Sequence, residues 1–254
     1  MTEAEKTELI KQAIQELEVA LSRLVVKIGP PIYIAEAGKP RFRYTDPDPI
    51  KLMVLKTVRV VSGLNAATVL LEAGYIIEMG VLFRTIDDYI DEITFVGETV
   101  ESGATTTDQK RFIEAFFEDD TRTTTELLQD QPRHHRVERK KIHASLERVL
   151  GRYLPKTPGL VRRMSRAIDD VYSGVVHGSL TSIMELYDGD QERFRVSGML
   201  GHRLMRVYRV ELAHYTHRAL NTLGIIALFL GLVDLGDHLR DARVAFEASE
   251  AYQN

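Results

Sequence analysis

Four polar residues between positions 166 and 177 have the types and the spacing of a candidate reactive stripe. Arg166, Asp170, Ser173 and His177 follow one another at i, i+4, i+7 and i+11. On a helix they fall within an arc of about 60°. A Ser-His-Asp trio suggests a hydrolase, but consecutive turns of one helix supply neither the oxyanion donors nor the strained nucleophile that acyl transfer needs. The stripe therefore indicates either acid–base chemistry at His177 or the solvated face of an amphipathic helix.

The surroundings of His177 favour a groove in which a second helix could lie. The residue stands between Gly174 and Gly178, and small residues let another helix come close. An imidazole held in such a groove can act as an acid or a base near neutral pH. Met164 and Val171 occupy the opposite, apolar side of the same helix. The small-residue groove favours a homodimer.

A second candidate site lies in the stretch RLMRVYRVELAHYTHRAL, residues 203–220. Glu211 and His214 form an E-x-x-H pair, and His217 lies one turn further along. The pair is half of the ligand set of di-iron carboxylate bundles, which needs a second E-x-x-H and two further carboxylates. The sequence has no second copy, so we predict neither a metal nor a cofactor. A surface or interface stripe is the alternative.

A long stretch free of proline, Leu64–Val96, is predicted to be the central helix. Within it Arg84 can pair with Asp87 and Asp88, at i+3 and i+4. Glu78 is expected to project toward the apolar side, where a carboxylate needs a partner from another helix. The central helix is therefore the expected organiser of any site.

Two stretches of the chain resemble a known family. GYIIEMGVLFRTIDDYIDEITFV, residues 74–96, is similar to the E-x5-R helix of a group of bacterial all-helical proteins of unknown function. YSGVVHGS, residues 172–179, is similar to the later signature of that group, in which a His follows four residues after a Ser. The group resembles the HEPN superfamily and abortive-infection proteins, which are helical and often dimeric. The matching positions are Glu78, Arg84, Ser173 and His177.

The resemblance implies a metal-independent ribonuclease or a defence effector. In such proteins a His acts as acid or base, here His177, and a basic residue at the dimer groove stabilises the scissile phosphate. Five residues before His177 stands Tyr172, where the active HEPN motif has Arg, so Arg84 or Arg166 would have to supply the charge. The alternative is a non-catalytic dimerisation or partner-binding module, in which Glu78, Arg84 and His177 are buried polar ties between helices.

Basic residues are concentrated in one segment of the chain. Residues 133–166 hold 11 Lys and Arg against 2 Asp and Glu, although the net charge of all 254 residues is −4. Such a segment could attract the phosphates of RNA. It could equally be a basic helix that faces an acidic neighbour in the same or another chain.

The composition excludes some classes of protein. Cysteine is absent, which rules out disulfides and cysteine-ligated zinc and fits a reducing compartment. The first residues are charged and helical, so no signal peptide is expected. The longest apolar run, residues 223–233, is too short to span a bilayer. We therefore expect a cytoplasmic protein without a membrane partner.

The pattern of the sequence predicts an all-α, HEPN-like bundle of long antiparallel helices forming a single domain, residues 1–254. Residues 1–48 would form an N-terminal helix, about 3–28, followed by an extended arm, because residues 30–50 hold five prolines. Residues 49–254 would form the core of the bundle. Expected breaks are at Ser62-Gly63, at 97–107 and at 154–158. The N-terminal helix would begin with a capping box of Thr2 and Glu5, and the next helix would begin at Asp48-Pro49. Short helices are expected over 108–117 and after Thr121, a basic helix at about 133–153, and further helices to Tyr187, over 201–232 and over 234–251.

Overall fold

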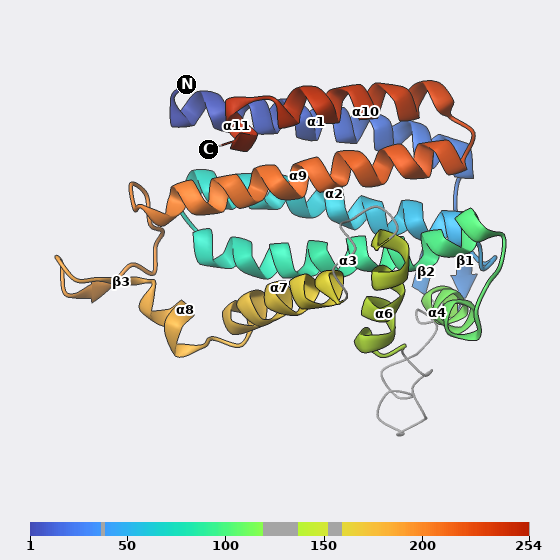
Figure 1. The fold of residues 1–254 in the computed structure, drawn as a ribbon, viewed down its shortest axis with the longest axis horizontal. Helices are drawn as coiled ribbons and strands as arrows, with labels where there is room; N and C mark the ends of the chain where they lie inside the picture. The colour runs from blue at the N-terminus through green and yellow to red at the C-terminus, as the bar shows by residue number, and fades with distance from the viewer. Residues whose placement is uncertain (37–38, 119–136, 152–158, 254) are drawn as a thin grey trace.

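Long helices lying side by side build the molecule, as Figure 1 shows. The computed structural model describes residues 1–36, 39–118, 137–151 and 159–253. Its long helices are α1 (Glu3–Ile28), α2 (Pro49–Ala73), α3 (Ile76–Ser102) and α9 (Leu204–Phe229). Successive long helices run antiparallel, whereas α9 runs in the same direction as α1 and α3 (Figure 1). The predicted all-α bundle is confirmed.

Helix α1 has the limits that its sequence predicts. The Thr2 side chain accepts the Glu5 N–H and the Glu5 side chain accepts the Thr2 N–H, which forms a capping box. Gly29, with φ +79°, ends the helix. The apolar side of α1, with Ile10, Leu17 and Leu24 buried, packs against α2, α9 and α10 (Val233–Glu247). Helix α1 therefore contributes to the core of the bundle together with helices that follow residue 48.

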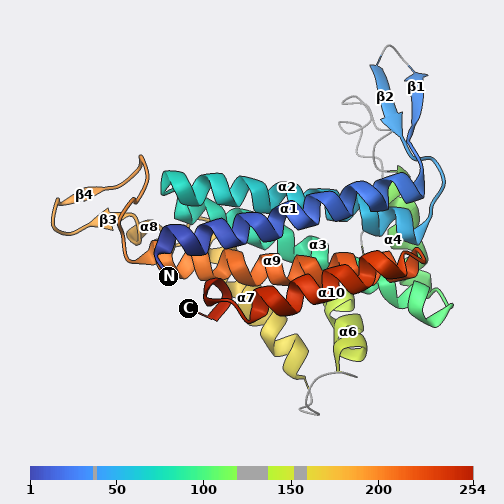
Figure 2. The same cartoon turned by 90° about the horizontal axis from the view of Figure 1, so that it is seen from above.

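The extended segment after α1 forms a β-hairpin. Strand β1 (Ile32–Glu36) pairs antiparallel with β2 (Lys39–Arg43), and the Tyr33 and Phe42 rings meet edge to face at 5.3 Å. Figure 2 shows the hairpin extending away from the helices. The sequence predicted the extended backbone correctly, but a hairpin replaces the single extended arm.

The predicted break at Ser62-Gly63 is wrong, because α2 continues to Ala73. A Cβ at Gly63 would meet Ile86 Cγ1 at 3.0 Å, so this glycine lets α2 and α3 pack closely. The chain turns instead at Gly74, whose φ is +79°. The stretch predicted as one central helix is therefore divided between the end of α2 and the beginning of α3.

Helix α3 is also longer than predicted. Gly97 lies inside it and is buried, and a Cβ there would contact Met53 at 3.4 Å. The helix ends only at Ser102, where Gly103 adopts φ +67°. The expected loop at 97–107 is thus a short connection to α4 (Thr107–Glu118), which itself occurs where the sequence predicts it.

The second half of the chain has more breaks than the sequence indicates. The expected helix reaching Tyr187 is divided into α7 (Leu160–Val176), α8 (Leu180–Met184) and the hairpin of β3 (Tyr187–Asp188) with β4 (Arg193–Phe194). The expected last helix is α10 followed by α11 (Glu250–Gln253). The basic helix is described as α6 (Arg139–Leu150). Its predicted ends, the proline-rich break and the helix predicted after Thr121 lie outside the described residues.

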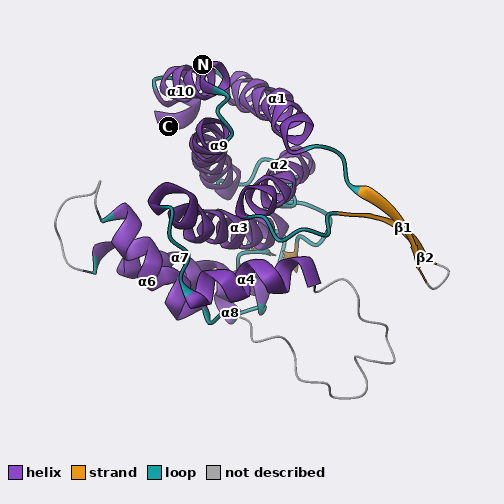
Figure 3. Cartoon of the chain, turned by 90° about the vertical axis from the view of Figure 1, so that its right-hand side faces the viewer, coloured by secondary structure: helices purple, strands orange, loops and turns teal. Residues whose placement is uncertain are grey.

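Helix α2 is the one described helix whose length and composition would allow it to cross a membrane. In the end-on view of Figure 3 it lies in the middle of the bundle with α3 and α9. Leu52, Val60 and Leu64 are completely buried there. Burial in the bundle core accounts for these apolar residues of α2, whereas others, such as Val69, are exposed.

The Gly74 corner allows a direct test of the fold. A Cβ at Gly74 would meet the backbone nitrogens of Met199 and Leu200 at 2.8 Å, whereas Gly103 has nothing within 4 Å. Both glycines have positive φ, so Gly103→Ala should cost about 1–2 kcal/mol of unfolding free energy. Gly74→Ala should cost about 1–3 kcal/mol more, because of overpacking. Chemical denaturation checks this, and equal losses in the two variants would contradict the close approach.

Candidate functional site

The stripe of Arg166, Asp170, Ser173 and His177 lies on the outer side of α7. All of them are exposed except Ser173, which is half-buried. The side of α7 that faces α3 carries Tyr172 instead, whose ring packs against Phe83 at 6.0 Å. The solvated-face interpretation of the stripe is therefore the better description of these residues within one chain.

Two residues on the apolar side of α7, Met164 and Val171, are exposed to solvent and not packed against the core of the described helices. Met164 is 52% exposed and Val171 is 65% exposed. They lie on the apolar side that the sequence predicts, but α3 covers α7 along Tyr172 and Asp169, which project in a different direction. An apolar stripe consequently faces the solvent next to the polar one.

The signature YSGVVHGS ends one helix and begins the next. The His177 N–H donates to Ser173 O at 2.9 Å, and the Ser179 N–H donates to Gly174 O at 2.8 Å. Gly178 adopts φ +62°, and its N–H donates to Val175 O at 3.3 Å, which completes a Schellman motif. Ser179 then caps α8 by accepting the Ser182 N–H. His177 is thereby held as an exposed residue at the end of α7.

The predicted small-residue groove beside His177 is not formed. A Cβ at Gly174 would meet Ser179 Oγ at 3.1 Å, so a residue of the same turn fills the space next to this glycine. Gly178 is needed for its positive φ. The two glycines therefore serve the turn between α7 and α8, and a homodimer cannot be argued from them.

Arg84 does not meet His177. Arg84 Nη1 pairs with Asp88 on its own helix and with Asp169 Oδ1 of α7 at 3.2 Å. Asp169 precedes His177 by eight residues, which is about 12 Å along a helix. The predicted Arg84–Asp88 pair is confirmed, but Asp87 pairs instead with Arg218 of α9 at 2.5 Å. Arg84, which was expected to bind phosphate, is thus already paired with two carboxylates.

Arg84 belongs to a set of charged residues between α3, α6 and α7, which we call the α3–α6–α7 charge cluster. Its members are Arg84, Asp88, Asp91, Arg139, His143 and Asp169. Arg139 Nη2 lies 3.1 Å from Asp91 Oδ2 and 3.5 Å from Asp169 Oδ1. His143 Nε2 lies 3.6 Å from Asp91 Oδ2 and 3.6 Å from Asp169 Oδ2. Each of the three helices contributes at least one member.

Burial dominates the electrostatics of the acidic residues of α3 in and beside this cluster. It raises the pKa of Asp88 above its usual value, against the opposing effect of Arg139 and Arg84. Burial likewise raises the pKa of Asp87, and Arg218 opposes the shift. Carboxylates in this position need cationic partners, since an unpaired buried charge is strongly destabilising. The ion pairs of the cluster therefore join α3, α6 and α7 and stabilise their packing.

The basic segment is largely neutralised inside the chain where it is described. On α6, Arg139 pairs with Asp88 and Asp91, Lys141 with Asp108 at 2.8 Å, and Arg148 with Glu98 at 3.4 Å. Helix α6 is therefore a basic helix that faces acidic residues of the same chain, the alternative to RNA binding that the sequence left open. RNA binding through residues 133–166 stays a prediction, with less free charge on α6 to support it.

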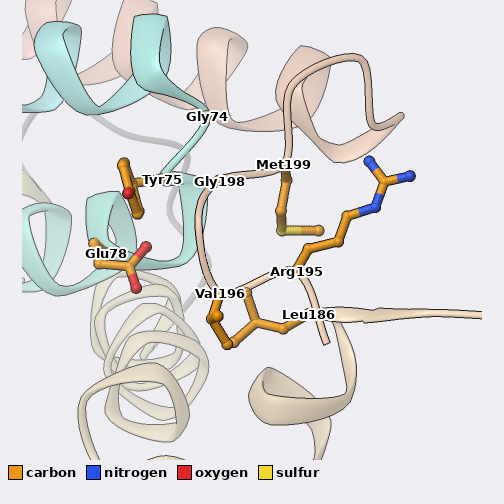
Figure 4. Close-up of a pocket in the computed structure, with 8 residues that line it drawn as sticks. All are labelled: Gly74, Tyr75, Glu78, Leu186, Arg195, Val196, Gly198 and Met199. Atoms are coloured by element: carbon orange, nitrogen blue, oxygen red, sulfur yellow. The ribbon is translucent and has the colours of Figure 1, made fainter. Parts of the chain in front are cut away.

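Glu78 does not face the core. It is exposed in the first turn of α3, and the expected buried partner is therefore unnecessary. Its carboxylate borders a small cavity (Figure 4). Gly80 and Val175 lie close together, as do Phe83 and Tyr172, so α3 and α7 run antiparallel and Glu78 lies near the His177 end of α7. Arg84 is separated from both.

The two histidines of the second candidate site share an aromatic neighbour, Tyr252, whose ring lies 4.8 Å from that of His217, whereas Glu211 has a different partner. Glu211 accepts a hydrogen bond from the Tyr172 hydroxyl at 3.4 Å, and the His214 ring lies 5.0 Å from the Tyr252 ring. His217 Nε2 lies 3.4 Å from Glu247 Oε2, and burial lowers the pKa of His217, against the effect of Glu247. In the described part of the chain, no group of three or more His, Cys, Asp or Glu side chains could hold a metal ion.

Sequence reasoning missed the partners that the interior charges use. Arg139, His143, Asp169 and Arg218 were not among the candidates. Arg139 and His143 are one turn apart on the basic helix, and three Asp residues share one side of α3. The opposite charges of these two helix faces could have suggested that they pair. The sequence does not show, however, which helix lies opposite which.

Comparison of the chain with protein-family models, with curated proteins and with solved structures found no match.

Removal of Arg84 should show that the charge cluster stabilises the fold. Arg84→Ala leaves Asp88 and Asp169 short of a partner and should cost about 1–3 kcal/mol, which lowers Tm by about 3–10 °C. The matched control is Arg206→Ala, an exposed arginine on α9, which should change the unfolding free energy by less than about 0.5 kcal/mol. Thermal denaturation measures both, and the structural assignment fails if the two variants melt alike.

Proposed function

We propose that this protein is a helical module that binds a second copy of itself through the outer side of α7. The observation that carries the proposal is the apolar stripe that the described chain leaves open to solvent. It consists of Met164 at 52% exposure, Val171 at 65% and the exposed Ala167 between them. Exposed apolar surface of this kind on a folded domain is typical of a protein–protein contact.

The stripe is complementary to itself. Met164, Ala167 and Val171 are three and four residues apart, which places them on one side of the helix. In an antiparallel pair of α7 helices that cross at Ala167, Met164 lies opposite Val171 of the partner subunit, and the reverse contact follows from two-fold symmetry. The small side chain of Ala167 lets the two helices come close at the axis.

The flanking charges fit the same pairing. Arg166 and Asp170 are both exposed and lie next to the stripe. The antiparallel arrangement brings Arg166 near Asp170 of the partner subunit, and the symmetric contact repeats this ion pair. Exposed apolar residues on α8 extend the surface beyond α7: Leu180, Ile183 and Met184. A self-complementary patch with paired charges at its rim is what an isologous dimer requires.

The dimer predicts a specific effect of a charge in the stripe. Val171→Glu places two carboxylates in the interface and should weaken self-association at least tenfold. Val69→Glu on α2 is the matched control, because Val69 is 64% exposed but lies on another helix. Analytical ultracentrifugation over a concentration series measures the dissociation constants.

The expected result is a dimer for the wild type and for Val69→Glu, and a monomer for Val171→Glu at the same concentration. A wild-type protein that stays monomeric throughout the series would overturn the proposal, as would equal weakening in the two variants. Circular dichroism verifies that both variants remain folded, which is expected because both positions are exposed.

RNA cleavage is the second candidate function, and it rests on one observation. The imidazole of His177 is exposed at the end of α7, where a phosphodiester could reach it. Within one chain, Arg84 is paired with carboxylates and Arg166 lies eleven residues away, about 16 Å along the helix. Cleavage therefore requires a cation other than Arg84 and Arg166 of the same chain, supplied either by the second copy or by another basic residue that moves toward His177 when RNA binds.

A cleavage assay decides this second candidate. Purified protein is incubated with structured RNA, alongside His177→Ala and the control His238→Ala, which alters another exposed histidine. A catalytic His177 predicts a loss of about 100-fold or more in His177→Ala and none in the control. Equal activity in all three proteins, or activity in none, excludes His177 as an acid–base catalyst.

A further inference from the structure

A small cavity lies between the α2–α3 corner and the loop after β4, at some distance along the chain from the stripe of α7 (Figure 4). Its volume is about 100 Å³. The side chains that matter for its chemistry are Tyr75, Glu78, Leu186, Val196 and Met199. The cavity thus combines one carboxylate, one aromatic ring and three aliphatic or thioether walls.

The backbone around the cavity is tightly fixed. The Met199 N–H donates to Gly74 O at 2.8 Å, and Met199 itself is buried. Gly198 has φ +103°, and a Cβ there would meet Ala73 O at 2.5 Å. On the other side the Arg195 N–H donates to Leu186 O at 2.7 Å. These contacts hold the loop against the corner, so the cavity is built before any ligand arrives.

The cavity carries a negative charge, that of Glu78, for which the described residues provide no ion pair. The Glu78 carboxylate points into it, whereas the Arg195 guanidinium points away (Figure 4). Arg195 is occupied by Asp188, whose Oδ2 lies 2.6 Å from Nε and 2.5 Å from Nη2. The helix dipole favours a carboxylate at this position in the first turn of α3, but it does not explain why the carboxylate is directed into a cavity with largely apolar walls.

Neighbouring groups make the surroundings of Glu78 more negative. Tyr208 has its pKa raised to about 12, first by burial and then by the charges of Glu185, Glu211 and Glu78. Three carboxylates therefore act on one phenol near this end of α3. An anion would be repelled here, and a cation would be attracted.

The size of the cavity limits the ligand. An engineered apolar cavity of about 150 Å³ takes up benzene, and pockets for drug-sized ligands measure about 300–1,000 Å³. A cavity of about 100 Å³ therefore holds the end of one side chain and excludes a nucleotide or a cofactor. An aliphatic stem suits the walls formed by Leu186, Val196 and Met199, and a cationic head suits Glu78 and the Tyr75 ring.

We propose that this cavity binds the alkylammonium or alkylguanidinium end of a lysine or arginine side chain presented by a partner polypeptide. The head group makes a charge-assisted hydrogen bond to Glu78, and the methylene stem lies along Leu186 and Val196. The site does not depend on the α7 dimer. It gives the module a second binding surface, with a specificity for basic side chains.

The experiment is a titration followed by NMR. Capped lysine (Nα-acetyl-lysine methylamide) is added to the full chain, and the amide signals of Gly74, Gly198 and Met199 are monitored. Capped norleucine, which keeps the stem but lacks the charge, is the ligand control. We expect saturable shifts with capped lysine and at least tenfold weaker binding of capped norleucine. No saturable shift at these amides, or equal binding of the two ligands, overturns the proposal.

Variants of the protein show whether capped lysine binds at Glu78 or elsewhere on the surface. Glu78→Gln should bind capped lysine at least tenfold more weakly and keep its Tm, because Glu78 is exposed. Glu101→Gln, about 35 Å further along α3, should bind like the wild type. Val171→Glu should also bind like the wild type, which distinguishes this site from the α7 dimer. Butylamine, which keeps the stem and the ammonium group but lacks the peptide backbone, should also shift the same amide signals, because the cavity holds only the end of the side chain. Butylamine that leaves these signals unchanged would contradict the proposed contacts.

Discussion

The carboxylates that α3 carries into the interior determine which helices can surround it. Buried acidic groups are tolerated when cations accompany them, and here each cation comes from a different helix. Asp87 receives Arg218 from α9, and Asp91 receives Arg139 from α6. Arg84 of α3 reaches Asp169 of α7. Three neighbours are thus aligned on one helix by ion pairs, in addition to the apolar packing around Phe83.

This use of charge has consequences for function. An arginine that already pairs with two carboxylates is a poor phosphate ligand, and Arg139, Lys141 and Arg148 of α6 are likewise paired with carboxylates. Exposed charges at the periphery include those on the outer side of α7 and Glu78. Both places adjoin exposed apolar groups. The chemistry of the surface therefore favours recognition of other polypeptides, while the chemistry of the interior favours stability.

The signature around His177 has a structural explanation that does not require catalysis. Gly178 supplies a positive φ, Ser179 caps the next helix, and Tyr172 packs on Phe83. Each of these residues would be needed in any chain that turns sharply between two helices against α3. His177 is the ionisable side chain of the signature that the turn leaves exposed, and for this reason it remains the candidate for any reaction.

The sequence by itself determined the elements that depend on neighbouring residues: the capping box of α1, the Asp48-Pro49 start of α2, α4, and the all-α class. It misplaced the break between α2 and α3, because Gly63 and Gly74 look alike until packing against Ile86 and φ +79° distinguish them. Tertiary structure alone decided that Glu78 is exposed and that Arg84 pairs with Asp169. Those outcomes depend on which distant helix lies opposite, and the spacing of residues along one helix contains no information about that.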